Sequence, residues 1–95
     1  MKTKPTCRTC TNGNKYWWLN GKLHREDGPA VEYADDHKRW YLNGERHRED
    51  GPAVEDADGT KEWYLNGIEY SEPNYYRELY KLGKITKEEL FIKLI

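Results

Sequence analysis

Apolar and polar side chains alternate along this chain over short runs, the spacing that is typical of a β-strand with one buried face. The runs recur at a fixed interval of 23 residues, which separates Trp17, Trp40 and Trp63. Each tryptophan is followed at the same distance by Leu-Asn-Gly. A fixed period of this length indicates a repeat protein built from one supersecondary unit.

The clearest copies of the unit are residues 17–32 and 40–55, which agree at 13 of 16 positions. Both contain HREDGPAVE without a change. The third copy keeps WYLNG at 63–67 and then diverges. A terminal repeat is expected to diverge in this way, because its outer face must cap the array rather than stack on a neighbour.

Two turns are predicted in each period. One turn is at Asn20-Gly21 and its copies. The other turn is at Asn12-Gly13, Asp35-Asp36 and Asp58-Gly59, and at these three places we expect two-residue hairpins. In that register Val31 faces Trp40.

The register also predicts which side chains share a face of the sheet. The expected core face carries Trp17, Trp40, Trp63, Leu19, Leu42, Leu65, Val31 and Val54. The other face carries a half-covered aromatic stripe with small neighbours, made of Trp18, Tyr41, Tyr64, Ala30 and Ala53.

The pattern becomes helical after Tyr70. Ser71-Glu72-Pro73 can open a helix that ends at Gly83, and Thr86 with Glu89 resembles a capping box for a second helix. We expect these helices to lay an apolar side on one face of the sheet.

The predicted fold class is therefore mostly β with an α cap: a single-layer antiparallel β-meander of 23-residue repeats followed by two short helices. One domain spans 1–95, with a half repeat at 1–11, repeats at 12–70 and a helical cap at 71–95.

Composition narrows the function classes. Sixteen basic and 17 acidic residues are intermixed, so there is no basic field for phosphate backbones and nucleic acid is an unlikely partner. Neither a membrane-spanning apolar run nor a signal peptide is present, and we expect a cytoplasmic protein that does not bind membranes.

The repeated loop carries a set that looks catalytic, because a histidine beside carboxylates can act as a general acid or base. An active site is needed once, whereas this set recurs with the structural period. Repeated side chains of this kind usually tie a loop to its neighbour. The sequence therefore predicts structural repeat loops at His24, Arg25, Glu26 and Asp27 and at His47, Arg48, Glu49 and Asp50.

Cys7 and Cys10 have the spacing of half a zinc site. No second CxxC follows, and residues three apart in a regular strand point to opposite faces. We therefore expect no metal and no cofactor, and Cys7 and Cys10 are only weak candidates for metal ligands.

The aromatic stripe is the predicted partner surface, because tryptophan, tyrosine and arginine are the usual anchors of protein interfaces. The partner-binding residues predicted are Trp18, Tyr41, Tyr64, Arg39 and Lys61. Lys2, Lys4 and Arg8 near the first strand are expected to protect the sheet edge, which favours a monomer or a weak homodimer.

The segment YLNGERHREDGPAVEDADGTKEW at 41–63 resembles a divergent MORN-type repeat, and residues 12–70 share the resemblance. It is closest to the HREDGPA-containing repeat of uncharacterised phage and large-virus proteins. The resemblance implies an elongated antiparallel sheet with a binding role and a phage source. HREDGPA replaces the closely spaced glycines of the usual repeat, so membrane binding does not carry over.

Three functions stay open. We favour a protein-interaction module, phage-encoded, that inhibits a host protein or defence complex in the host cytoplasm. The alternative is a small-molecule or nucleotide binder that uses the arginines and histidines of the loops. A hydrolase based on His24 and His47 comes last, because the chain has no Walker-type loop, serine nucleophile elbow or dinucleotide fingerprint, and we expect a protein that is not an enzyme.

Overall fold

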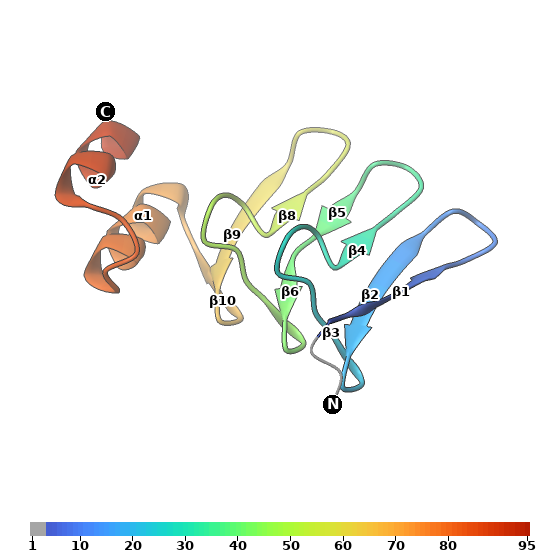
Figure 1. Cartoon of the computed structure of the whole chain (residues 1–95). Helices are drawn as coiled ribbons and strands as arrows, with labels where there is room; N and C mark the ends of the chain where they lie inside the picture. The colour runs from blue at the N-terminus through green and yellow to red at the C-terminus, as the bar shows by residue number, and fades with distance from the viewer. Residues whose placement is uncertain (1–3) are drawn as a thin grey trace.

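The computed structural model describes residues 4–95, in which short strands follow one another before two helices (Figure 1). The strands are β1 (Thr6–Thr9), β2 (Lys15–Leu19), β3 (Lys22–Leu23), β4 (Val31–Glu32), β5 (Lys38–Arg39), β6 (Tyr41–Leu42), β7 (Glu45–Arg46), β8 (Val54–Glu55), β9 (Lys61–Leu65) and β10 (Ile68–Tyr70). The helices are α1 (Glu72–Lys81) and α2 (Lys87–Leu94). Residues 1–3, and with them the predicted role of Lys2, lie outside the described part of the chain.

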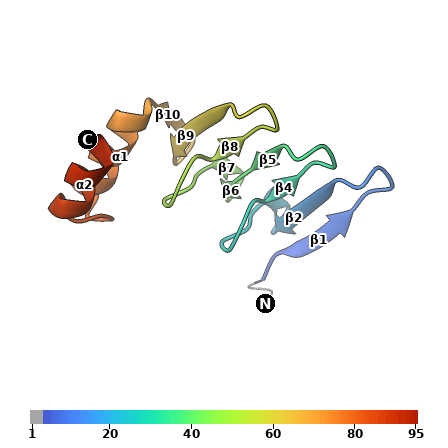
Figure 2. The same cartoon turned by 90° about the horizontal axis from the view of Figure 1, so that it is seen from above.

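The strands form an antiparallel meander. The main sheet has the order β1-β2-β4-β5-β8-β9-β10, with β3 paired to β2, and β6 pairs with β7. Successive repeats are joined where the Gly44 amide donates to the Leu23 carbonyl and the Gly67 amide to the Arg46 carbonyl, both at 2.9 Å. The molecule measures 44 × 37 × 18 Å, and its strands form one sheet with the two helices at one end, as the view from above shows (Figure 2). The predicted meander with a helical end is confirmed.

The turns predicted at Asn20-Gly21 and its copies are present, and two residues join the strands there. Leu19 pairs with Lys22 across Asn20 and Gly21, whose φ angles are 52° and 77°. Positive φ at both central residues is the geometry of a type I′ turn, whose twist matches that of the flanking strands.

The turns at the other end of the strands are one residue longer than predicted. The Asp36 amide donates to the Tyr33 carbonyl at 3.1 Å and the Tyr33 amide to the His37 carbonyl at 2.9 Å. Asp36 is left-handed, with φ 73°, and Gly13 and Gly59 hold the equivalent place with φ 91°. A type I turn followed by a left-handed residue makes a three-residue loop. The prediction of two-residue hairpins here is wrong.

The extra loop residue shifts the cross-strand pairs. Val31 lies opposite Arg39 rather than Trp40, and Val54 lies opposite Glu62 rather than a tryptophan. Because a one-residue shift of register exchanges the two faces of a strand, both valines lie on the face opposite to the one predicted.

The two faces of the sheet can now be defined. The tryptophan face contains Trp17, Trp40, Trp63, Leu19, Leu42, Leu65, Ala30 and Ala53. The tyrosine face contains Arg8, Tyr16, Trp18, Leu23, Val31, Arg39, Tyr41, Arg46, Val54, Glu62 and Tyr64. The prediction of Ala30 and Ala53 beside the aromatic stripe is therefore wrong, although Trp18, Tyr41 and Tyr64 do share one face.

Both helices begin where predicted, and the first also ends where predicted. The Ser71 side chain accepts from the Asn74 amide at the start of α1, and Gly83, with φ 76°, follows its last turn. At the start of α2, Thr86 and Glu89 form a complete capping box. Local sequence thus specifies both helix starts.

The helices cover the tryptophan face only over the last hairpin. Tyr75 and Leu79 of α1 are buried against Leu65, and the Tyr75 ring lies 5.1 Å from that of Trp63. Within residues 4–95, α2 packs on α1 and buries no side chain of its own. The expected helical cover is therefore confirmed for α1 at one end of the sheet, and it is wrong for the rest of that face.

Candidate functional site

The HRED loops cover the tryptophan face in the first two repeats, and His24 joins one repeat to the next. Its side chain is 7% exposed. Its Nδ1 accepts from the backbone amide of Asn43 in the following Asn-Gly turn at 2.9 Å, while Nε2 lies 3.2 Å from the Glu26 carboxylate. These two bonds require the neutral imidazole with its hydrogen on Nε2.

The second repeat reproduces this arrangement. His47 Nδ1 accepts from the Asn66 amide at 2.9 Å, and its Nε2 lies 3.0 Å from the Glu49 carboxylate. The side chain is 8% exposed. Two copies with the same bonds show that the histidine position belongs to the repeat rather than to a single site.

The loop arginine is held on an indole. The Arg25 guanidinium lies 3.9 Å from the centre of the Trp17 ring and donates to the Asp27 and Glu32 carboxylates, both at 3.0 Å. It also donates to the Pro29 carbonyl at 3.2 Å. Stacking and ionic bonds together fix this side chain over the sheet.

Arg48 occupies the same position in the second repeat. It lies 3.9 Å from the Trp40 ring and donates to Asp50 at 2.8 Å and to Glu55 at 2.7 Å. In the last repeat, an aromatic ring of α1 covers the tryptophan instead of an arginine, with Tyr75 on Trp63. The HRED loops and α1 are therefore equivalent layers over successive tryptophans.

The glycine of HREDG makes room for the arginine. A Cβ added at Gly28 would lie 2.9 Å from the Arg25 guanidinium carbon, and one at Gly51 would lie 2.8 Å from that of Arg48. No Cβ can come so close, and both guanidinium groups are pinned by the bonds above. The spacing from arginine to glycine is thus a packing requirement of the loop.

The predicted structural role of the tetrad agrees with this geometry. His24, Arg25 and Asp27 are all bonded within the loop or to the next repeat. Because both ring nitrogens of His24 are engaged, neither is free to take a proton from a bound substrate.

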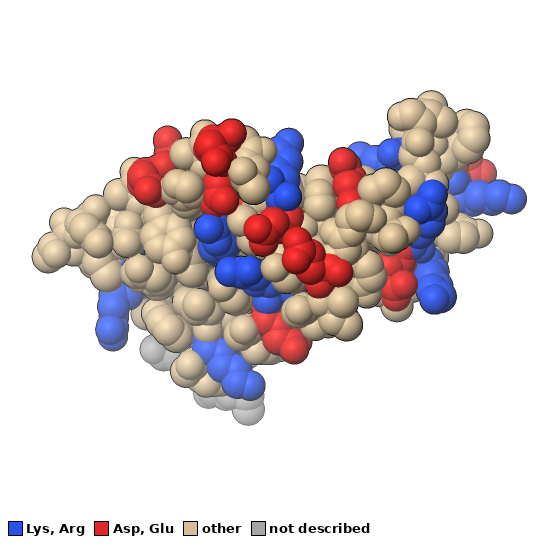
Figure 3. Space-filling view, turned by 180° about the vertical axis from the view of Figure 1, so that it is seen from behind, with Lys and Arg blue, Asp and Glu red and all other residues tan. Residues whose placement is uncertain are grey.

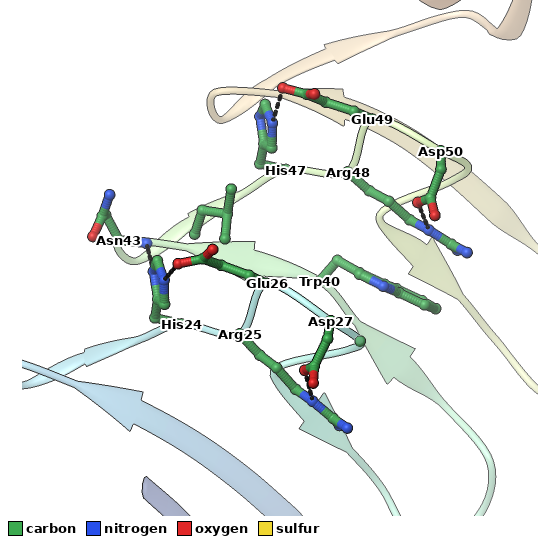
Figure 4. Close-up of a pocket in the computed structure, with 12 residues that line it drawn as sticks. His24, Arg25, Glu26, Asp27, Trp40, Asn43, His47, Arg48, Glu49 and Asp50 are labelled. Atoms are coloured by element: carbon green, nitrogen blue, oxygen red, sulfur yellow. Dashed lines mark hydrogen bonds and ion pairs between the residues drawn. The ribbon is translucent and has the colours of Figure 1, made fainter. Parts of the chain in front are cut away.

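The two loops enclose a groove of about 790 Å³. Figure 4 shows the groove, with Trp40 between the loop that carries Asp27 and the loop that carries Arg48. Trp40 and Leu42 supply its apolar lining, and the HRED residues of both loops supply its walls.

The predicted partner surface is the tyrosine face. Trp18 is 39% exposed and lies in a shallow hollow of about 210 Å³ lined also by Thr6, Arg8 and Gly21. Tyr41 is half-buried.

Tyr64 is half-buried like Tyr41. The two basic residues predicted beside the aromatic stripe lie on different faces of the sheet. Arg39 shares the tyrosine face and donates to Asp56 at 2.7 Å. Lys61 lies opposite Glu55, and alternation along β9 puts it on the face of Trp63.

Arg46 is the residue on this face that sequence reasoning missed. Its guanidinium donates to the Tyr41 hydroxyl at 3.4 Å and to the Tyr64 hydroxyl at 3.2 Å, and it lies 3.8 Å from the Glu62 carboxylate. The bond to Tyr41 raises the pKa of the guanidinium. The signal for it was present, because Arg46 replaces Leu23 in an otherwise near-identical repeat.

A second polar cluster joins the tips of neighbouring hairpins. His37 Nδ1 and Arg39 Nη1 each lie 2.7 Å from the same Asp56 oxygen. The bond to Asp56 raises the pKa of the His37 imidazole. The bonds from His37 and Arg39 lower the pKa of the Asp56 carboxyl.

The cysteines lie at the first hairpin. Cys7 is exposed in β1, opposite Trp17, and the Cys10 amide donates to the Asn14 carbonyl across the turn that follows. Within residues 4–95, no group of three or more His, Cys, Asp or Glu side chains is arranged to hold a metal ion.

Charges of both signs are spread over the surface. Figure 3 shows one face, on which acidic and basic side chains form small adjoining groups. Among residues 4–95, neither helix has the length and apolar character needed to cross a bilayer.

The chain was compared with protein-family models, with curated proteins and with solved structures, and none of the three comparisons found a match.

Proposed function

We propose that this protein is an interaction module that binds another protein through its tyrosine face. The observation that carries the proposal is the composition of that face. Arg8, Trp18, Tyr41, Arg46 and Tyr64 lie together on it. Tryptophan, tyrosine and arginine are the residues that contribute most of the binding energy at protein interfaces.

The arrangement of the face also supports a binding role. Arg46 ties the hydroxyl groups of Tyr41 and Tyr64 together, so two rings from neighbouring repeats are held in place before a partner arrives. Preorganised side chains lose less conformational entropy on binding. Trp18, opposite Leu23 and beside the shallow hollow, supplies an apolar anchor at one end.

The identity of the partner belongs to the same proposal. The repeat resembles those of phage and large-virus proteins, and on that ground we propose a host protein or defence complex that the bound module inhibits, in the host cytoplasm. The alternative, a binder of anionic small molecules, has less support, because the guanidinium groups of Arg25 and Arg48 already bond carboxylates of their own loops.

The proposal is tested by affinity capture from lysates of candidate host bacteria, followed by calorimetry with the purified partner. Trp18→Ala removes the exposed anchor, and we expect at least a tenfold loss of affinity, the size of effect seen when an interface anchor is truncated. Arg46→Gln tests the polar centre, with an expected loss of about fivefold.

Phe91→Ala is the matched control, because Phe91 is an exposed aromatic residue, 67% accessible, on α2. Its affinity should equal that of the wild type. A partner that is lost with Phe91→Ala but kept by Trp18→Ala and Arg46→Gln binds the helical cap, and the tyrosine face is then not the interface.

A further inference from the structure

We infer that the groove between the two HRED loops is a second binding site, which takes an arginine side chain from a basic segment of a partner protein. The groove contains Trp40 and Leu42, which belong to the tryptophan face. It therefore opens on the side of the sheet opposite to Trp18 and Tyr41, and it is independent of the interface proposed above.

The charge of the groove favours a cation. The lining contains the carboxylates of Glu26, Asp27, Glu49 and Asp50 but only two guanidinium groups, those of Arg25 and Arg48, so it has an excess of negative charge. A positively charged ligand would therefore be attracted to both walls.

Asp27 and Asp50 are paired with the two arginines, so Glu26 and Glu49 carry this excess. Each accepts from a histidine ring whose other nitrogen accepts a backbone hydrogen bond, so the ring is neutral and leaves the carboxylate charge uncompensated. Glu26 is 75% exposed and Glu49 is 43% exposed. Lys84 lies 3.7 Å from Glu49 and offsets one charge at the α1 end.

The protein itself shows how an arginine is held in these surroundings. Arg25 and Arg48 each stack on an indole at 3.9 Å while their nitrogens bond carboxylates. Arg48 already covers the Trp40 ring, so the groove offers an incoming side chain its carboxylates: Glu26 and Asp27 on one wall, and Glu49 and Asp50 on the other (Figure 4). A guanidinium has five N–H donors in a planar fork and can bond carboxylates of both walls at once, whereas a lysine ammonium is a point charge with three donors.

The size of the groove suits a peptide side chain rather than a large cofactor. Its volume of about 790 Å³ lies within the range of about 300–1,000 Å³ that is usual for ligand sites. It is an open channel between two loops, so an extended chain can lay one arginine into it and continue on either side. Leu42 lies in the lining and can contact the methylene groups of that side chain.

The experiment uses the full chain and a penta-arginine peptide with blocked ends. The peptide is titrated while the Trp40 indole N–H is followed by NMR and the affinity is measured by calorimetry. We expect the Trp40 resonance to shift, a penta-lysine peptide to bind about threefold more weakly, and a penta-glutamate peptide to produce no shift.

The variant Glu26→Gln/Glu49→Gln removes two groove charges and keeps an oxygen that can accept from each histidine. We expect it to weaken penta-arginine binding about 5- to 10-fold. The control Glu69→Gln/Glu88→Gln makes the same change of net charge away from the groove, and its affinity should stay within about twofold of the wild type.

Two results would overturn the inference. One is a Trp40 resonance that does not move at millimolar penta-arginine. The other is an equal loss of affinity in the groove variant and in the Glu69→Gln/Glu88→Gln control, which would mean that the peptide responds to net charge alone. Both results leave the tyrosine-face proposal untouched, because that proposal is tested with Trp18 and Arg46.

Discussion

Replacing His47 by alanine separates a structural from a catalytic role for the HRED loops. The ring is 8% exposed and makes two hydrogen bonds, one of them at 2.9 Å from the Asn66 amide of the next repeat. Losing the acceptor for a part-buried amide costs about 1–3 kcal/mol, and lost packing raises the expected total to about 2–3 kcal/mol.

That loss is large enough to measure by thermal unfolding. In a domain of this size, 1 kcal/mol corresponds to about 4–8 °C in Tm, so His47→Ala should lower Tm by about 10–20 °C. Calorimetry or circular dichroism gives the value, and urea unfolding at 25 °C gives the free energy of unfolding independently.

Two further substitutions divide the effect between the ring nitrogens. In His47→Asn the side-chain oxygen lies near the position of Nδ1 and can still accept from Asn66, so about half of the stability should return. In His47→Gln the amide lies near Nε2, and the bond to Asn66 is lost. The structural role would be refuted if His47→Ala melted within about 2 °C of the wild type and abolished a measurable enzymatic turnover. A catalytic histidine would give that result.

Three other perturbations test the loops and turns. Gly28→Ala should lower the free energy of unfolding by about 1–2 kcal/mol, because the new Cβ displaces the guanidinium of Arg25 from the Trp17 indole. In a protein that already carries Arg25→Ala, urea unfolding should show that Gly28→Ala costs less than about 0.5 kcal/mol. Asp36→Gly should raise the free energy of unfolding by about 0.5 kcal/mol, because glycine adopts a left-handed conformation without strain. The bond between His37 and Asp56 should make stability depend on pH, as seen by comparing urea unfolding of the wild type and Asp56→Asn.

The sign of that pH dependence follows from the two shifts. The raised pKa of His37 contributes stability that is fully present below about pH 6.5, its ordinary value, and is lost as pH rises through the folded-state pKa. The lowered pKa of Asp56 contributes stability present above about pH 3.8, lost as pH falls through its folded-state pKa. The difference between wild type and Asp56→Asn should therefore be largest between these values, and a difference that is flat from pH 4 to 8 would contradict the assignment.

The controls for the glycine and aspartate changes lie within the repeats. Additive losses for Gly28→Ala and Arg25→Ala would show that the glycine is not there to admit the guanidinium. Gly59 occupies the place of Asp36 in the next turn, and Gly59→Ala should destabilise the protein, so a neutral effect of both changes would contradict the role of left-handed geometry.

The sequence determined the local elements of this protein. The turns at Asn20-Gly21 and its copies and the starts of both helices depend on residues within a few positions of one another, and the structure has them as predicted. Two features could be placed by the period alone: the HRED loops between hairpins, and Trp18, Tyr41 and Tyr64 on one face.

Register and the contacts between repeats were decided by the tertiary structure. Asp35-Asp36 and Asp58-Gly59 are turn signals that do not fix the length of the turn, and the three-residue loops found there moved Val31 and Val54 to the other face. The sequence also held no sign that His24 bonds the Asn43 amide, because its partner is a backbone group that any residue at that position would offer.

Arg46 and the groove illustrate the same limit. Arg46 could be singled out as a departure from the repeat, but its bonds to Tyr41 and Tyr64 depend on how neighbouring hairpins align. The groove exists only because two identical loops stand side by side at the spacing of the sheet. Each repeat could be predicted from the sequence because interactions between residues close in the chain define it. The binding surfaces depend on the distances between repeats, and these distances are set only when the repeats pack together.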